Sequence, residues 1–267
     1  MEVNYLDIAK TLSLKEDDVL LITGNISLLA FYETRQGNQF DIQKFIDSFK
    51  LQLPQGALFF HAFNDNLVSG DTFDYKRSKP NTGSLSVAAW KDQDFVRTKD
   101  PFHSFLIWGE DSDYLQQINN KSTFGKDSVF AYLHQKKAKM LIINVLLENC
   151  FTFVHYCEEC IGVDYRKFVK HNIQYVSQDD KKSIEEKWFY TRKAGYYNSF
   201  AALEKALEDE KIMQVIPLNE SVFKMIDLAA CYDFIEQEIS GGNTHFLCSF
   251  SYKKWLKDVA KMMLVRS

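Results

Sequence analysis

An apolar run of strand length, residues 140–145, constrains the fold of this chain more than any other stretch. It predicts a strand buried on both faces, which is typical of parallel strands in a sheet covered by helices. Two more apolar segments, 19–22 and 57–63, flank residues 41–51, whose apolar side chains recur at helical spacing. A strand, a helix and a strand in this order predict a parallel pair with a right-handed crossover.

The rest of the chain continues this alternation of short helices and strands. Residues 64–82 are rich in turn formers and predict a long functional or mobile loop. No repeat, low-complexity tract or linker divides the sequence, so we expect an α/β fold around one sheet and a single domain over residues 1–267. Helices are predicted over 5–14, 84–90, 110–118, 127–134, 199–207, 222–239 and 252–264, and strands over 104–108, 173–176, 187–191, 214–217 and 245–250.

Composition narrows the class of protein. The 267 residues carry a net charge of −4 and are 46% hydrophobic, enough for a sizeable core and without the basic excess of a nucleic-acid partner. The first ten residues lack the apolar stretch of a signal peptide, and no apolar run reaches the ~20 residues of a membrane span. Because the five cysteines are scattered and odd in number, we expect reduced thiols in a cytoplasmic protein.

A histidine and a glutamate follow the buried strand at helical spacing. After a predicted loop over 146–151, Thr152 stands at an N-cap position, His155 follows three residues later and Glu158 three after that. Residues i and i+3 share one face of a helix, so the imidazole and the carboxylate should point the same way. Such a pair suits proton transfer near neutral pH. The alternative is a packed histidine that precedes an acidic patch by chance.

Residues 95–105 form the second stretch with chemical potential. An arginine there would fit a phosphate through two parallel hydrogen bonds. A surface loop in which the arginine pairs with a nearby carboxylate is an equal alternative. The side chains that provide cationic, hydroxyl and imidazole groups are Arg97, Lys99, Thr98, Ser104 and His103.

Metal and nucleotide motifs are weak or missing in the sequence. Cys157 and Cys160 have the spacing of half a zinc site, but no second pair of ligands follows, so we expect no metal. A thiol- or zinc-dependent hydrolase would rest on these two cysteines alone. The sequence contains no GxxxxGK[ST] loop, no GxGxxG turn and no GxSxG nucleophile elbow.

Four ordered segments form a recognisable series. They are Phe73-Asp74 with Pro80-x-Thr82-Gly83, Arg97-Thr98-x-Asp100-Pro101-x-His103-Ser104-Phe105, Phe124-Gly125-x-x-Ser128 and Thr152-x-x-His155-x-x-Glu158. In this order they resemble the FD…PxxTG, RS-x-HP-x-HSF, FGxxS and T-x-x-H-x-x-E motifs of the aminoglycoside N-acetyltransferases that act at the 3-amino group. The likeness covers most of the chain. It implies that family's α/β fold, with a mixed, largely parallel central sheet flanked by helices.

The resemblance also implies transfer of an acyl group from acyl-coenzyme A to a primary amine. We expect His155 to remove a proton from the amine and Glu158 to hold the imidazole tautomer, with no acyl-enzyme. Backbone N–H groups around residues 25–27 are candidates for the oxyanion donors. Asn64 and Asp74 are the expected contacts to the acceptor. The side chains expected to bind the coenzyme are Thr23, Gly24, Asn25, Ser27, Arg97, Thr98 and Ser104.

The chain departs from the family near the coenzyme loop and on the acceptor side. Asp100 replaces the first histidine of the RS-x-HP-x-HSF motif, Gly24 and Asn25 replace two serines of an HSSLSS segment, and residues 61–64 replace a PTF-type segment. The resemblance therefore specifies the transfer chemistry more closely than it specifies the acceptor.

The acceptor is predicted from charge. An aminoglycoside is a polycation, and its site would be lined with Asp and Glu. Residues 187–193 instead mix lysine and arginine with aromatic rings, which suits a nucleotide-linked sugar, although a strand with snorkelling lysines would look the same. We expect a dTDP- or UDP-linked amino deoxysugar for surface polysaccharide, with an aminoglycoside as the alternative. A non-catalytic coenzyme A or sugar-binding protein is the second alternative, and a homodimer is left open.

Overall fold

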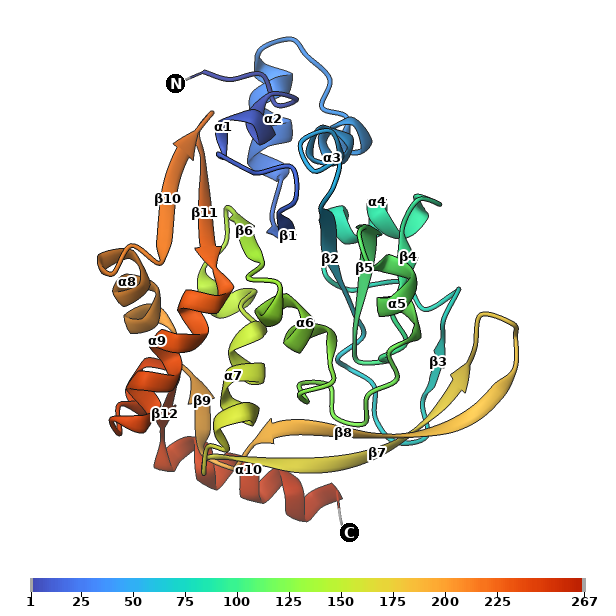
Figure 1. The fold of residues 1–267 in the computed structure, drawn as a ribbon. Helices are drawn as coiled ribbons and strands as arrows, with labels where there is room; N and C mark the ends of the chain where they lie inside the picture. The colour runs from blue at the N-terminus through green and yellow to red at the C-terminus, as the bar shows by residue number, and fades with distance from the viewer. Residues whose placement is uncertain (1, 266–267) are drawn as a thin grey trace.

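A seven-stranded mixed sheet forms the centre of the protein, and the computed structural model describes residues 2–265 (Figure 1). Strands β1 (Val19–Gly24) and β2 (Ala57–Phe63) pair in parallel with helix α3 (Ile42–Lys50) between them in sequence, which confirms the predicted strand–helix–strand unit. Strand β6 (Lys139–Ile143) pairs in parallel with β1 and is buried as predicted.

The remaining pairings of this sheet are antiparallel, so the sheet is mixed but not largely parallel as expected. The difference arises because hairpins, rather than helical crossovers, complete both edges of the sheet. The strand order is β10-β11-β6-β1-β2-β5-β4. The outer strands are β4 (Val96–Arg97), β5 (His103–Gly109), β10 (Met213–Leu218) and β11 (Ser221–Asp227).

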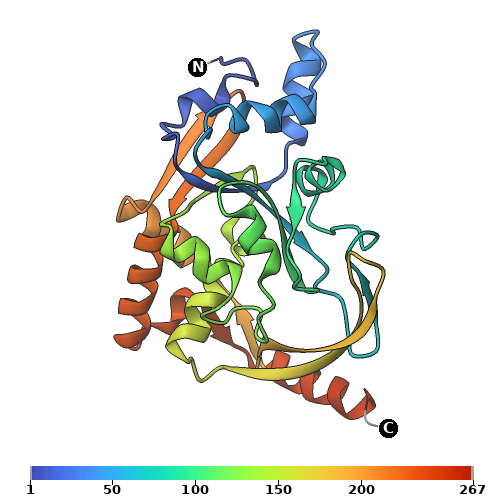
Figure 2. The ribbon, with the colours of Figure 1, turned by 45° about the vertical axis from the view of Figure 1, so that its right-hand side comes forward.

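Helices cover both faces of the sheet, as Figure 2 shows. Because side chains alternate along a strand, Leu21 and Phe59 belong to one core cluster while Leu20 and Phe60 belong to the other. Side chains of α6, α7, α8 and α9 pack in the first cluster, and side chains of α1, α3 and α4 pack in the second. The helices are α1 (Ile8–Thr11), α2 (Ser27–Arg35), α4 (Ser84–Lys91), α5 (Ser112–Gln117), α6 (Val129–Gln135), α7 (Phe153–Ile161), α8 (Ala201–Asp209), α9 (Leu228–Ser240) and α10 (Tyr252–Val265).

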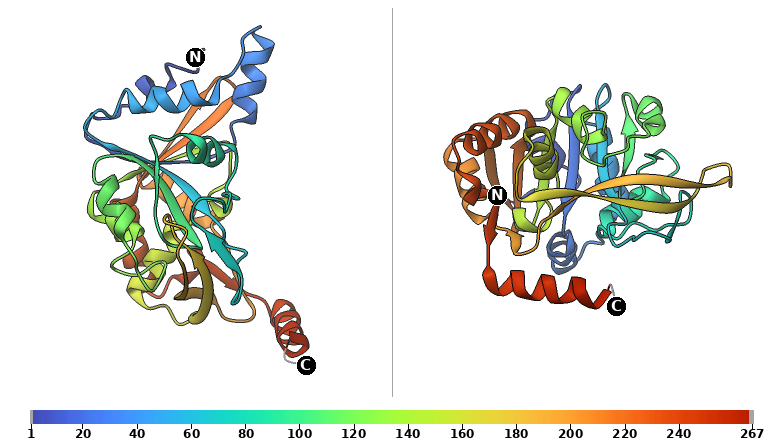
Figure 3. Two further views of the ribbon diagram at one scale, coloured as in Figure 1. Left: turned by 90° about the vertical axis from the view of Figure 1, so that its right-hand side faces the viewer. Right: turned by 90° about the horizontal axis from the view of Figure 1, so that it is seen from below.

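A long hairpin of β7 (Arg166–Val176) and β8 (Lys182–Arg192) crosses below the central sheet (Figure 3). Both strands extend well beyond the predicted segments 173–176 and 187–191. The predicted loop 64–82 supplies β3 (Thr72–Asp74), which pairs with β7 and completes a three-stranded sheet. Helix α10 lies beside the base of the hairpin and projects from the body of the protein (Figure 3).

Several predicted boundaries were wrong. The helix expected over 222–239 is β11 followed by α9, because Asp227 ends the strand and its side chain caps the helix by accepting a hydrogen bond from Ala230 N at 3.0 Å. The strand expected over 245–250 is the 3-10 helix Thr244–Phe246 followed by β12 (Cys248–Phe250), which pairs with β9 (Tyr196–Asn198). The predicted helix over 5–14 is reduced to α1, and the loop 146–151 holds the 3-10 helix Leu147–Asn149.

Candidate active site

Helix α7 carries the histidine and the glutamate on one face, as the spacing predicted. The Nδ1 atom of His155 lies 2.7 Å from Oε2 of Glu158. Thr152 occupies the N-cap position, but its side chain makes no capping hydrogen bond. The helix ends at Gly162, whose positive φ of 80° suits glycine at a C-terminal cap.

Glu158 is fully buried and surrounded by donors. In addition to His155, Tyr165 donates to Oε1 at 2.9 Å, and Nε of Arg166 lies 2.6 Å from Oε2. Burial opposes ionisation, but the hydrogen bond from His155 and the charge of Arg166 lower the pKa of Glu158 below its ordinary value. Glu158 is therefore a carboxylate at neutral pH.

Two neighbours of His155 act on the same ring nitrogen. The carboxylate of Glu158 has only acceptors, so its contact of 2.7 Å favours a proton on Nδ1 and a lone pair on Nε2, whereas Nη2 of Arg166 has only donors, lies 2.7 Å from the same Nδ1 and favours the opposite tautomer. Nε2 has no hydrogen-bond partner within residues 2–265, and the His155 side chain is 18% exposed. Burial and the charge of Arg166, whose Nη2 lies 2.7 Å from Nδ1, lower the pKa of His155 despite the opposing effect of Glu158. The ring is thus a neutral, accessible base at pH 7.

A cleft of about 420 Å³ opens at the ends of β1, β2 and β6. We call it the strand-end cleft; its lining includes Thr23, Gly24, Phe63 and Thr152. Thr152 precedes His155 by three residues, so the imidazole lies about one helical turn further along the same face. Ligands of open α/β sheets commonly bind beyond the carboxyl ends of the strands, which is where this cleft lies.

Three helices begin at the rim of the strand-end cleft. Gly24 comes shortly before α2, Thr82 shortly before α4 and Thr152 directly before α7, and all three residues line the cleft. Each helix N-terminus carries the positive end of the helix dipole, although the N–H groups of Ser27, Val154 and His155 already have acceptors. The cleft is therefore suited to a ligand that carries negative charge.

Two of the expected coenzyme contacts have internal partners. Asn25 N donates to Ile143 O at 2.8 Å, and Ser27 N donates to the Asn25 side chain at 2.9 Å. These two N–H groups are therefore already engaged, which speaks against the expectation that they bind an oxyanion. Gly24 has a φ of +135°, and a Cβ there would lie 2.2 Å from Ile143 O, so its replacement of a family serine is dictated by close packing of β1 on β6.

The placement of Arg97 speaks against its predicted role in binding the coenzyme. The side chain is 4% exposed, and Nη2 donates to Ala62 O at 3.0 Å and to Asn64 Oδ1 at 2.7 Å. Nη1 donates to Ser78 O at 2.5 Å and to Tyr75 O at 3.4 Å, and Nε donates to the Ser104 hydroxyl at 3.0 Å. Burial lowers its pKa to about 10, so it stays cationic at neutral pH. All five N–H groups are used to join β2, β4 and the 64–82 segment.

Thr98, Ser104 and Asn64 belong to the same internal network, which corrects their predicted ligand contacts. Thr98 Oγ1 accepts from Phe105 N at 2.9 Å, and the Ser104 hydroxyl donates to Ala62 O at 2.7 Å. Asn64 accepts from Arg97 and donates to Lys79 O at 2.9 Å. A polar group that is buried must be hydrogen-bonded, and these residues satisfy one another.

Two acidic residues near this network serve turns. Asp74, predicted to contact the acceptor, accepts from Lys76 N at 3.0 Å and from Arg77 N at 2.9 Å. Asp100, the departure from the family histidine, is 5% exposed and accepts from Phe102 N at 2.9 Å and His103 N at 2.8 Å. Both are side-chain-to-backbone turns of the kind that aspartate favours.

The cysteines of α7 face different surroundings. Cys157 is fully buried, and burial raises the pKa of its thiol well above the ordinary value. Cys160 is half-buried, and burial raises its pKa too. No group of three or more His, Cys, Asp or Glu side chains that could hold a metal ion occurs in the part of the chain that the structure describes.

Sequence reasoning missed Arg166 and Tyr165, the residues that complete the surroundings of Glu158. Both lie just beyond α7, where the hairpin begins, and no local motif marks them. The available signal was indirect. A glutamate predicted on the buried side of a helix requires a cation or several donors, and Arg166 follows it by eight residues.

Comparison with known proteins shows the family of the chain. A family model described as aminoglycoside 3-N-acetyltransferase matches residues 60–240, more than half of the chain. No sequence among the curated proteins is similar enough to match. No helix within the described residues is long and apolar enough to cross a membrane.

Solved structures share the fold at low identity. The acetyltransferase AAC-IIIb with CoASH has a TM-score of 0.71 at 15% identity and covers 89% of this chain and 95% of its own. The YokD protein from Bacillus subtilis has a TM-score of 0.73 at 15% identity, with 90% and 94% covered. AAC-VIa bound to sisomicin has a TM-score of 0.69 at 16% identity, with 89% and 96% covered.

The mixed sheet flanked by helices is the fold of the acetyl-coenzyme A-dependent N-acetyltransferases. The chain belongs to the aminoglycoside 3-N-acetyltransferase family.

Proposed function

We propose that the protein transfers an acyl group from acyl-coenzyme A to the primary amine of an amino sugar, with His155 as the general base. One observation carries this proposal. The Glu158 carboxylate lies 2.7 Å from Nδ1 of His155, which favours an unprotonated Nε2, and Thr152, one turn earlier on α7, lines the strand-end cleft, although His155 itself does not. A core histidine with no catalytic role would not need a fully buried carboxylate to fix its tautomer.

The chemistry follows from the charge of the acceptor. A primary amine is mostly protonated at pH 7 and must lose a proton before its nitrogen attacks the thioester carbon. Nε2 of His155 accepts that proton, and Glu158 stabilises the imidazolium that forms. The C–S bond then breaks and the thiolate of coenzyme A leaves. No covalent intermediate with the protein is required, because both substrates are held together in one site.

The coenzyme is proposed to lie in the strand-end cleft. Its phosphates would face the N-terminus of α2, beside Thr23 and Gly24, and its thioester would approach His155 along α7. This placement needs no contact to Arg97, Thr98 or Ser104, whose polar atoms are already paired. The structure of AAC-IIIb with CoASH supports acyl-coenzyme A as the co-substrate.

Two classes of acceptor have support. Membership of the family and the structure of AAC-VIa bound to sisomicin favour an aminoglycoside. The cationic residues at the base of the β7–β8 hairpin favour a nucleotide-linked amino deoxysugar. Release of free coenzyme A from acetyl- and longer acyl-coenzyme A, measured with a panel of both acceptor classes, decides between them.

Replacement of His155 tests the mechanism. We expect His155→Ala to lower turnover by roughly 100-fold or more while coenzyme A binds almost as tightly as to the original protein. Release of coenzyme A gives turnover, and calorimetric titration gives affinity. His134→Ala is a matched control, because His134 is also partly buried but contacts Tyr156 on the far side of α7. Equal turnover in the two variants would remove His155 from this role.

A further inference from the structure

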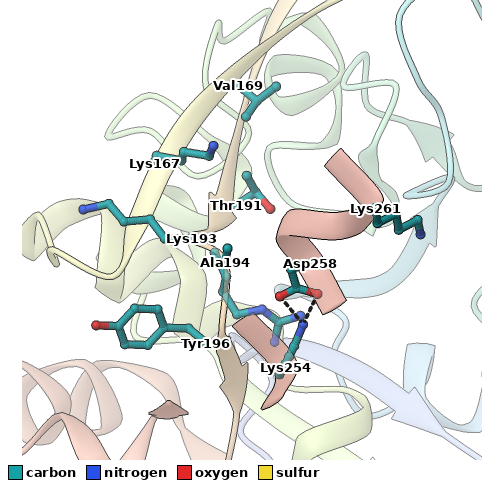
Figure 4. A pocket seen from close by; sticks show the side chains of 10 residues that line it. Lys167, Val169, Thr191, Lys193, Ala194, Tyr196, Lys254, Asp258 and Lys261 are labelled. Carbon is teal, nitrogen blue, oxygen red and sulfur yellow. Dashed lines mark hydrogen bonds and ion pairs between the residues drawn. The ribbon is translucent and has the colours of Figure 1, made fainter. Parts of the chain in front are cut away.

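A second cavity, of about 520 Å³, lies between the base of the β7–β8 hairpin and helix α10 (Figure 4). We call it the basic pocket. The hairpin side contributes Lys167, Thr191 and Lys193, and the helix side contributes Lys254, Asp258 and Lys261 (Figure 4). It is larger than the strand-end cleft, and the proposed transfer of the acyl group does not use it.

The charge of the basic pocket is opposite to that of the whole protein. Among the residues that the structure describes, five cationic side chains line it, Arg192 being the fifth, together with the single carboxylate of Asp258, so the net charge of this lining is +4. The whole chain has a net charge of −4. A concave surface with one sign of charge attracts ligands of the opposite sign and repels a polycation.

Most of these cations are available to a ligand. Lys254 pairs with Asp258 at 2.7 Å, which neutralises one cation with the only carboxylate. Within residues 2–265, the side chains of Lys167, Lys193 and Lys261 have no ion-pair partner, and all three are exposed. Arg192 is partly buried, and burial together with the charge of Arg166 lowers its pKa, so an anion placed beside it would relieve an unfavourable charge.

The basic pocket is connected to the catalytic side of the hairpin. Val169 and Thr191 line both the basic pocket and a smaller cavity of about 200 Å³, and Asp65 lines both that cavity and the strand-end cleft. Arg192 is paired in register with Arg166, the residue that contacts His155. A ligand that spans the strand-end cleft and the basic pocket would pass through this smaller cavity, and the ring of Tyr196 offers a stacking surface at its far end.

We propose that the basic pocket binds the phosphate or diphosphate group of the acceptor, so that the acceptor is an anionic amino sugar derivative rather than a polycation. This inference rests on the proposed function, because it assumes that the amine reacts at His155. It adds the substrate class: a sugar whose amine lies at one end and whose phosphate, linked to a nucleoside that can stack, lies at the other.

Binding of uridine diphosphate and thymidine diphosphate to the full chain tests the inference without turnover. We expect the double variant Lys167→Glu/Lys193→Glu to bind both at least about tenfold more weakly than the original protein in calorimetric titrations at low salt, since each reversal replaces an attraction with a repulsion. Lys170→Glu is the matched control, because Lys170 lies on the same strand, is 61% exposed and is outside the pocket. Equal weakening by the control, or no binding of either diphosphate to the original protein, would overturn the inference.

Coenzyme A also carries phosphates, so a second set of titrations distinguishes a pocket for the acceptor from a pocket for the coenzyme. If the basic pocket serves the acceptor, the double variant keeps its affinity for coenzyme A and for dephospho-coenzyme A. A loss confined to coenzyme A, with diphosphate binding unchanged, assigns the pocket to the coenzyme and contradicts the proposal. A failure of the proposed function is a different result, because His155→Ala would then leave coenzyme A release unchanged whatever the diphosphates do.

Discussion

Arg166 and Lys167 are neighbours on strand β7, yet they belong to two different electrostatic regions. Arg166 is 6% exposed and contacts Glu158 and His155, whereas Lys167 is exposed and lines the basic pocket. Successive side chains of a strand point to opposite faces, so one strand supplies a buried cation on one side and a free cation on the other. The comparison shows how adjacent charges acquire different tasks.

The surroundings decide what each charge does. Around Glu158 there is almost no water, so the interaction with Arg166 is strong and sets where a proton resides. At the basic pocket, water screens the charges of the lysines, so each lysine interacts only weakly with the charged groups around it. The buried charges around Glu158 should control stability and turnover, and the exposed charges of the basic pocket should control the affinity for an anion.

The largest effect is expected from Glu158→Gln. Gln preserves the shape but leaves Arg166 buried beside a neutral group, which should lower the free energy of unfolding by about 3 kcal/mol or more. The imidazole would also lose the carboxylate that fixes its tautomer, so turnover of the folded protein should fall by roughly 100-fold. Urea denaturation gives the first quantity, and release of coenzyme A gives the second.

Glu159→Gln is the matched control for that experiment. Glu159 is the next residue of α7, and it is only partly buried, with one hydrogen bond from the Ser122 hydroxyl at 2.7 Å. Its replacement should lower the free energy of unfolding by about 1 kcal/mol or less. Similar losses in the two variants would show that the buried cluster is no different from an ordinary partly exposed carboxylate.

The sequence predicts the buried site around His155 and Glu158 better than it predicts the exposed basic pocket. The buried strand and the shared helix face of His155 and Glu158 depend on local patterns, and both are found in the structure, although the strand ends at Ile143 rather than at Val145. The lysines of the basic pocket come from the hairpin and from α10, which are distant in sequence, so no local pattern brings them together. The internal hydrogen bonds of Arg97 were not predicted, because its acceptors come from segments up to 35 residues away and a local pattern cannot show that its donors are already used.

Boundaries failed for a related reason. On β11, Phe223 and Met225 pack in one core cluster and Ile226 packs in the other, as expected for a strand, yet the apolar content of residues 222–226 fits a helix almost as well. These residues form a strand because they pair with β6 and β10, and the pairing with β6 joins residues that are distant in sequence. The long hairpin was underestimated because its exposed middle residues are charged, which lowers the apolar signal without preventing pairing.

Acid should destabilise the protein through two buried histidines, His61 and His103. Burial, with the charge of His103, lowers the pKa of His61 to about 3, and burial lowers the pKa of His103 to about 4. The unfolded chain binds these protons near pH 6.5, so between pH 6.5 and those lower values it holds more protons than the folded protein. The free energy of unfolding should therefore fall as the pH drops through this window, by about 1.4 kcal/mol per pH unit for each of the two imidazoles.

Urea denaturation at pH 7 and pH 5 measures this slope. In His61→Leu, the free energy of unfolding should fall less steeply with pH, by the contribution of one imidazole. This holds whatever the variant does to stability at pH 7. His245→Leu is the control, because His245 is exposed, and its slope should match that of the original protein. A slope in His61→Leu that is unchanged would show that His61 takes up its proton without opening the fold.

The smallest effect is expected from Asp258→Asn in the basic pocket. The amide can still accept from Gly195 N, as the carboxylate does at 3.0 Å, but Lys254 loses its ion pair and becomes available to a ligand. Uridine diphosphate should bind about two- to fivefold more tightly, and the gain should shrink as salt is added.

The matched control is Asp209→Asn, which breaks the Lys205–Asp209 pair of 3.2 Å at the same i,i+4 spacing on α8. If both variants bind the diphosphate alike, the gain reflects net charge alone and the basic pocket does not distinguish itself from the rest of the surface. If only Asp258→Asn gains, the single carboxylate of the pocket limits its affinity, and the open region behaves as a binding site in the same sense that the buried one behaves as a catalytic site.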